Sequence, residues 1–125
     1  MGAQKILIVD DDQEIREMVK YALVDEGYDV LTADNGDAAL DVLSERTPHL
    51  ILLDMRMPVM DGWTFASEYR QRPPPHAPIV VMTAAVDAVQ WSREVSAAGC
   101  IPKPFDLSRL FDTVRLHALP MNDGD

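Results

Sequence analysis

Short, continuously apolar runs constrain the fold of this chain more than any other feature. Residues 6–9, 50–53 and 79–82 are each entirely apolar, a pattern typical of strands that are covered on both faces of a sheet. Residues 28–33 interleave polar and apolar side chains, which suits a strand at the edge of a sheet. Residues 100–102 predict a short fifth strand.

A helical pattern of apolar residues follows each strand. The predicted helices lie between Asp12 and Gly27, between Gly36 and Pro48, at about 62–70, at about 87–97, and from the cap residue Asp106 through Val114. Five strand–helix pairs predict an α/β fold, a doubly wound parallel five-stranded sheet with helices on both faces. With one strand suited to an edge and the apolar runs in the middle, the predicted strand order is 2-1-3-4-5, the flavodoxin-like (βα)5 arrangement.

The composition indicates one acidic domain. The 125 residues carry a formal net charge of -10, and such a surface repels nucleic acid and anionic membranes. No apolar run approaches the ~20 residues of a membrane span, and no signal peptide is recognisable. The single cysteine, Cys100, excludes an internal disulfide and suits a reducing compartment, so we expect a cytoplasmic location. We expect a domain over residues 1–119 and a disordered tail over 120–125.

Carboxylates follow two of the central strands at the point where each strand ends. Asp10, Asp11 and Asp12 come directly after the first strand, and Asp54 comes directly after the third. The carboxyl ends of parallel strands share one edge of the sheet, where open α/β sheets bind ligands. Crowded carboxylates repel one another, and a metal cation neutralises them. The sequence therefore predicts a Mg²⁺ site, with one carboxylate left to react.

Two further motifs follow strands, Thr83-Ala84 after the fourth and Lys103-Pro104 after the fifth. With these motifs in order, the chain resembles the receiver domain of two-component response regulators, of the chemotaxis-regulator kind, over residues 5 to about 118. The string Asp-x-x-Met-Pro-x-Met-Asp-Gly is the most specific part of the resemblance. The matching segments are Ile8-Val9-Asp10-Asp11-Asp12, Leu53-Asp54-Met55-Arg56-Met57-Pro58-Val59-Met60-Asp61-Gly62, Val81-Met82-Thr83-Ala84 and Lys103-Pro104-Phe105.

The resemblance implies a phosphoacceptor and its metal. Asp54 would be the nucleophile that takes a phosphoryl group as an acyl phosphate, a reaction that needs mainly positioning and charge neutralisation. Mg²⁺ would be bound directly by Asp11, by Asp54 and by the backbone carbonyl of Arg56, with Asp10 acting through water.

The resemblance also implies groups that contact the phosphoryl oxygens. Lys103 would pair with one oxygen as a compact charge, and the Thr83 hydroxyl would hydrogen-bond another. The Lys103–Pro104 peptide bond is expected to be cis, which positions the ammonium group. Met57, Pro58 and Gly62 are expected to shape the loop after Asp54, while Asp61 caps the third helix.

The function implied is a phosphorylation switch rather than a turnover enzyme. A histidine kinase or phosphotransfer domain would donate the phosphoryl group, and the chain would assist only its own phosphorylation and dephosphorylation. The dianion would draw Thr83 and Lys103 inward and bias a two-state equilibrium in the last two strand–helix units. Those units would be recognised by a downstream effector, by an attached output domain, or by a second copy of the chain in a phosphorylation-dependent dimer.

The chain departs from the family pattern on the side that signals to partners. Receivers usually carry an aromatic residue three positions before the lysine, and Cys100 stands there. The segment from Thr83 to Lys103 is also slightly short. One hypothesis is that phosphorylation is retained while the output differs from the usual threonine–aromatic coupling. The alternative is that Cys100 is simply a small buried residue of an edge strand.

Two other function classes stay open from the residues alone. A phosphatase of the haloacid-dehalogenase type would use Asp10 as nucleophile and Asp12 as acid/base, and alanine at position 54 would spare it. A phosphorylation-independent interaction module is the third option, although the intact acidic residues argue against it. Trp63 and Trp91 are interpreted as packing residues, because the acidity disfavours nucleic-acid stacking.

Overall fold

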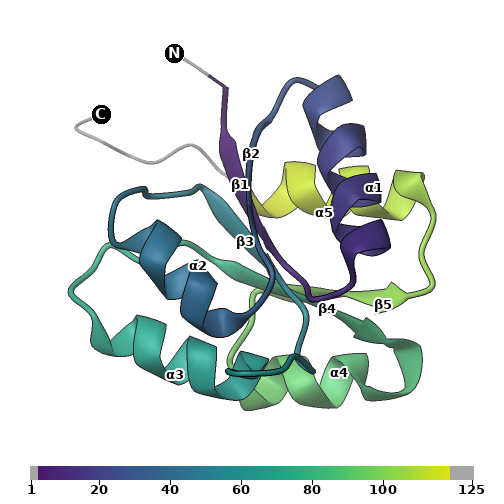
Figure 1. Cartoon of the computed structure of the whole chain (residues 1–125). Coiled ribbons are helices and arrows are strands. Elements are labelled where there is room, and N and C mark those ends of the chain that lie inside the picture. Colours follow the sequence, from purple (N-terminus) through teal and green to yellow (C-terminus); the bar gives the residue numbers. More distant parts are fainter. Residues whose placement is uncertain (1–2, 119–125) are drawn as a thin grey trace.

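The structure is a computed structural model that describes residues 3–118, in which strands and helices alternate along the chain (Figure 1). The strands are β1 (Lys5–Val9), β2 (Asp29–Ala33), β3 (Leu50–Leu53), β4 (Ile79–Ala84) and β5 (Gly99–Lys103). The helices are α1 (Gln13–Asp25), α2 (Gly36–Leu43), α3 (Gly62–Gln71), α4 (Ala85–Glu94) and α5 (Leu107–His117).

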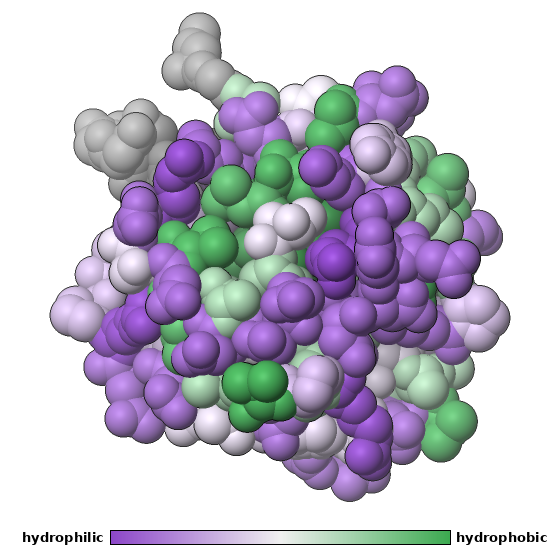
Figure 2. Space-filling view, in the orientation of Figure 1, coloured by the Kyte–Doolittle hydropathy of each residue, from purple (hydrophilic) through white to green (hydrophobic). Residues whose placement is uncertain are grey.

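The strands form one parallel sheet in the order β2-β1-β3-β4-β5. This confirms the predicted fold class and strand order. The residues of β3 are wholly buried, whereas β2 is an edge strand in which only its last residue, Ala33, is buried. Figure 2 shows a largely hydrophilic face with a hydrophobic patch over this edge strand. The interleaved pattern of residues 28–33 therefore predicted the edge correctly.

Two apolar layers lie on opposite faces of the sheet. Successive side chains of a strand point to opposite faces, so Ile6 and Ile8 of β1 join one layer while Leu7 and Val9 join the other. Helices α1 and α5 cover the first layer, and α2, α3 and α4 cover the second (Figure 1). Burial on both faces explains why the central strands are continuously apolar.

Short polar side chains begin four of the five helices. The side chains of Asp12, Asn35, Asp61 and Asp106 accept backbone N–H groups at the starts of α1, α2, α3 and α5. The predicted caps Asp12, Asp61 and Asp106 are confirmed. These caps fix where each helix leaves the carboxyl edge of the sheet, and Asp12 does so directly beside Asp10 and Asp11.

Two helix boundaries differ from the prediction. α4 was expected at about 87–97 but spans Ala85–Glu94, directly after a strand that runs through Ala84. The strand is longer because Ala84 pairs with Lys103 of β5, and the short connection then leaves no loop before the helix. α2 ends at Leu43, before the expected stop at Pro48. At this end the Ser44 hydroxyl donates to the main-chain carbonyl of Asp41.

The predicted tail over residues 120–125, and the expected domain end at residue 119, lie outside the described residues. Within residues 3–118, none of the helices has both the length and the apolar character needed to cross a membrane.

Candidate phosphoacceptor site

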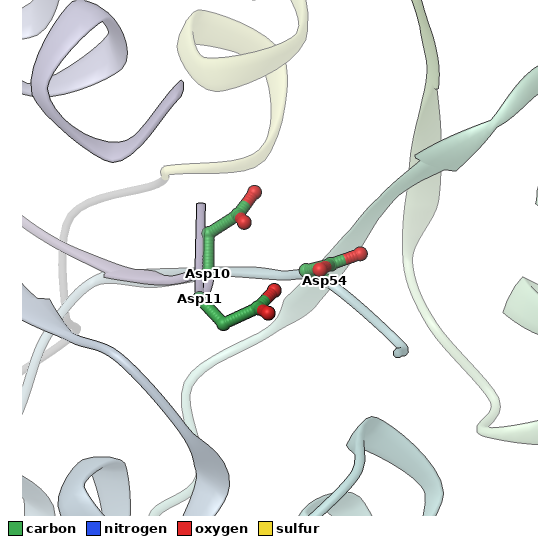
Figure 3. Close-up of side chains that lie close together, drawn as sticks. All are labelled: Asp10, Asp11 and Asp54. Atoms are coloured by element: carbon green, nitrogen blue, oxygen red, sulfur yellow. The ribbon is translucent and has the colours of Figure 1, made fainter. Parts of the chain in front are cut away.

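Three carboxylates meet at the carboxyl edge of the sheet. Asp10 and Asp11 leave the end of β1, and Asp54 leaves the end of the neighbouring strand β3 (Figure 3). One oxygen from each carboxylate lies within 4.8 Å of the other two. The backbone holds the two strand ends together, because the Asp54 N–H donates to the carbonyl of Val9 across 2.8 Å. The structure thus brings together the three carboxylates that the sequence predicted to meet.

Asp10 is completely buried, and both of its carboxylate oxygens have partners. Oδ1 accepts a hydrogen bond from the Asp12 N–H at 2.9 Å, and Oδ2 accepts one from the Lys103 ammonium at 2.9 Å. The Arg16 guanidinium donates to the main-chain carbonyl of Asp10 at 2.8 Å. Asp11 is exposed by contrast. The arrangement leaves Asp11 and Asp54 freer than Asp10 to bind a cation directly.

Asp54 is held in an environment that resists its negative charge. Asp54 is 7% exposed, and the pKa of its carboxyl is raised from 3.8 to about 7, mainly by burial. The negative charge of Asp10 contributes to this rise, the Lys103 ammonium opposes it, and the Asp11 charge adds a smaller contribution. A divalent cation beside the three carboxylates would remove this repulsion. Oxygen donors of this kind are the ligands that Mg²⁺ prefers, so the residues present fit the predicted metal.

Lys103 reaches the site from the end of β5, on the far side of β4 from Asp54. Its ammonium lies 3.7 Å from Asp54 Oδ1, and its side chain is 21% exposed. The Lys103–Pro104 peptide bond is cis, as the resemblance implied. Sequence reasoning expected Lys103 near a phosphoryl oxygen and did not foresee its bond to Asp10.

Thr83 and Cys100 lie on the neighbouring strands β4 and β5. Thr83 is 4% exposed near the end of β4, two residues beyond Val81, which pairs with Leu53 of β3. Cys100 of β5 is half-buried, pairs with Val81, and packs against the apolar layer under α2, α3 and α4. Thr83 is therefore level with the site, whereas Cys100 lies farther from the edge, on the side of the sheet that α4 covers.

The loop after Asp54 is closely packed where it enters α3. The Gly62 N–H donates to the Met55 carbonyl at 2.9 Å, and a Cβ on Gly62 would lie 2.8 Å from the Met55 Cα atom. Only glycine fits this approach, which supports the expected loop-shaping role of Gly62. Arg56 lies in the same loop with an exposed side chain.

Besides the Lys103–Asp10 bond, sequence reasoning missed three contacts around the site. It gave no role to the Arg16 side chain, and it treated Trp63 and Trp91 as separate packing residues. The two tryptophan rings in fact contact each other, and the Arg56 guanidinium lies over Trp91. No motif signals such contacts, because they depend on how the side chains pack in three dimensions.

Comparison with known proteins identifies the family. The sequence matches the family described as "Response regulator receiver domain" over residues 6–115, most of the chain. The chain belongs to this family. The receiver prediction is therefore confirmed over the phosphatase alternative, and the domain is of the kind that two-component systems use as a phosphorylation switch.

Individual relatives of this receiver agree with that assignment. The chain is 37% identical over 126 residues to sporulation initiation phosphotransferase F of Bacillus subtilis, covering 99% of this chain and 100% of that protein. It is 38% identical over 124 residues to response regulator protein FleR of Pseudomonas aeruginosa, covering 98% of this chain but only 26% of FleR. Among solved structures, chemotaxis response regulator CheY4 of Vibrio cholerae aligns with a TM-score of 0.84 and 34% identity, covering 94% of this chain and 100% of that one.

Proposed function

We propose that this receiver accepts a phosphoryl group on Asp54 from a phosphohistidine. A carboxylate oxygen of Asp54 attacks phosphorus, the phosphorus–nitrogen bond breaks, and the departing imidazole nitrogen takes up a proton. Water later attacks the same phosphorus, which releases inorganic phosphate and restores the carboxylate. The observation that carries the proposal is the meeting of Asp10, Asp11 and Asp54, with the Lys103 ammonium 3.7 Å from Asp54.

Asp11, Asp54 and the backbone carbonyl of Arg56 would hold Mg²⁺, and Asp10 would act through water. The engagement of both Asp10 oxygens supports this division, since an oxygen already bonded to Lys103 or to the Asp12 N–H is a poorer direct ligand. When bound, the ion would neutralise charge on the carboxylates and on the transferring phosphoryl group.

Lys103 and Thr83 would contact the phosphoryl oxygens once Asp54 is modified. The Lys103 ammonium already lies between Asp10 and Asp54, so a small movement would bring it to a new anion on Asp54. Thr83 is near the end of β4, and α4 begins two residues later at Ala85. Movement of Thr83 in β4 would therefore be transmitted to α4, β5 and α5, the other elements of the last two strand–helix units.

The phosphodonor would be a histidine kinase or a phosphotransfer domain. The partner that recognises the phosphorylated receiver would be a downstream effector, an attached output domain or a second copy of the chain. FleR is named a response regulator, and the chain spans about a quarter of it, so an output domain attached to this receiver is one form of this proposal. The domain over residues 1–119 would act in the cytoplasm and, with its acidic surface, would not itself bind nucleic acid or membranes.

The proposal is tested by incubating the protein with a small phosphodonor and Mg²⁺ and measuring its intact mass. We expect addition of one phosphoryl group, loss of that addition in Asp54→Ala, and loss when a chelator removes the metal. Asp12→Asn is the matched control, because asparagine also caps helices while the alternative phosphatase mechanism requires Asp12 as acid/base. An adduct that persists in Asp54→Ala contradicts the proposal.

A further inference from the structure

Four side chains form a cluster between α3, α4 and the loop after Asp54. The Arg56 guanidinium carbon lies 5.0 Å from the centroid of the Trp91 ring, within the range of a cation–π contact. The Trp63 and Trp91 rings meet edge to face at 4.9 Å between centroids. The Trp63 indole N–H donates to Glu94 across 2.7 Å. We call Arg56, Trp63, Trp91 and Glu94 the α3–α4 clasp.

The clasp is joined to the phosphoacceptor site through the backbone of Arg56. This residue stands two positions after Asp54, and its carbonyl is the proposed metal ligand. Its exposed side chain forms no ion pair among residues 3–118, and its guanidinium lies over the buried ring of Trp91 instead. A shift of the backbone at Arg56 must therefore move this contact with α4.

α4 has no capping side chain at its N-terminal end, the end away from Trp91 and Glu94. Ala84 at the N-cap position makes no side-chain hydrogen bond, and Val86 and Val89 are exposed, at 89% and 54%. The helix is held mainly through the buried residues Ala88 and Trp91. Among the helices of residues 3–118, α4 is the one whose start has no capping side chain, so its first turn is the helix start least held by local hydrogen bonds.

The clasp also places an aromatic ring on the face where β5 carries none. Cys100 packs against the apolar layer that contains Trp91. The cysteine side chain is too small to take the part that an aromatic ring at this position has in the usual threonine–aromatic coupling. Trp91 is a large ring on this face, and it contacts the loop that follows the phosphoacceptor.

We propose that the α3–α4 clasp couples the metal-bound and phosphorylated states of the site to the position of α4, with Arg56 and Trp91 as its positioning residues. This inference rests on the proposed phosphorylation of Asp54. The coupling is reciprocal, so weakening the clasp also changes the affinity of the site for Mg²⁺.

The test is hydrogen exchange over residues 85–94, measured with and without phosphodonor and Mg²⁺ and compared at equal Asp54 occupancy determined by mass. We expect the wild-type protein to change its α4 exchange on phosphorylation. In Arg56→Ala and Trp91→Leu this change falls about two- to fivefold, the factor that corresponds to one exposed cation–π contact. Trp91→Phe, which keeps an aromatic face, restores most of the response. Arg93→Ala removes an exposed positive charge from α4 outside the clasp and responds as the wild type does.

Each outcome decides between the two proposals. If Asp54 is fully phosphorylated and α4 exchange in Arg56→Ala and Trp91→Leu changes as much as in the wild type, the clasp proposal is wrong and the proposed function stands. If Asp54 stays unmodified in the wild type, the proposed function fails and the clasp proposal fails with it. Arg56→Ala alters an exposed side chain, so it keeps the test decisive if Trp91→Leu does not fold.

Discussion

The ammonium of Lys103 is hydrogen-bonded to Asp10 at 2.9 Å and lies 3.7 Å from Asp54, the proposed phosphoacceptor. The ammonium therefore neutralises mainly the buried carboxylate of Asp10 and, to a lesser extent, the carboxylate of Asp54. A cation bound to the carboxylates would take over part of that neutralisation. Lys103 would then be free to pair with a phosphoryl oxygen, which explains how one ammonium group serves the site before and after phosphorylation.

The first prediction concerns the loss of this ammonium. Lys103→Met leaves the wholly buried Asp10 carboxylate without its charged partner, so we expect unfolding free energy without metal to fall by about 2 kcal/mol. Lys103→Arg keeps a positive charge beside Asp10, so its unfolding free energy should fall by less. Urea unfolding in the presence of a chelator measures both. Equal stability of Lys103→Met and wild type would show that the pair does not stabilise the fold.

The second prediction concerns the charge of Asp54. The pKa of Asp54 is raised in the folded state from 3.8 to about 7. Between these two pH values the folded protein therefore holds a proton that the unfolded chain releases. The ionised carboxylate therefore destabilises the fold, fully above pH 7 and progressively less as pH falls toward 4. Allowing for partial solvation of the group, Asp54→Asn should raise metal-free stability by about 2 kcal/mol at pH 8.

The pH dependence of this gain is the check. Urea unfolding of Asp54→Asn and wild type is compared at pH 8 and pH 5 in a chelator, and the gain should be smaller at the lower pH. Adding Mg²⁺ at pH 8 should stabilise the wild type and narrow the difference. A gain that grows as pH falls would contradict the raised pKa.

The third prediction separates the neighbouring aspartates Asp11 and Asp12. Asp11→Asn removes a charged oxygen ligand, so its Mg²⁺ affinity should fall by about tenfold or more. Asp12 serves as the α1 cap, and Asp12→Asn should keep both the affinity and the helix. Calorimetric titration with Mg²⁺ measures each variant. Weaker binding in Asp12→Asn than in Asp11→Asn would mean that the metal lies elsewhere.

The fourth prediction concerns the position usually occupied by an aromatic residue. Cys100→Tyr adds a ring to a half-buried site that already packs against the apolar layer beneath α4, so it should cost about 1–3 kcal/mol of stability. It should also alter phosphorylation-dependent partner binding or dimerisation, measured by ultracentrifugation with and without phosphodonor. Identical responses of the two proteins would support the view that Cys100 is only a small strand residue.

The fold was predictable because its pattern is local. Four-residue apolar runs identify β1 and β3 as central strands, and interleaved polar residues identify β2 as an edge. The start of α4 was not predictable in this way. No capping side chain marks it, and the strand before it is lengthened by pairing of Ala84 with Lys103, a contact between distant parts of the chain.

The site was predictable to the level of which residues meet. Strand ends place Asp10, Asp11 and Asp54 at one edge whatever their rotamers, since the backbone topology decides it. The choice of Asp10 as the partner of Lys103 depends on side-chain positions at that edge, and the contact of Arg56 with Trp91 depends on how α4 packs. Neither follows from spacing along the chain.

The most direct test of the account is chemical localisation of the phosphoryl group. The protein is incubated with a small phosphodonor and Mg²⁺, the acyl phosphate is reduced with borohydride, and tandem mass spectrometry finds the residue converted to homoserine. The account predicts conversion at Asp54 and none at Asp10, Asp11 or Asp12. Conversion at Asp10 with Asp54 intact would contradict it.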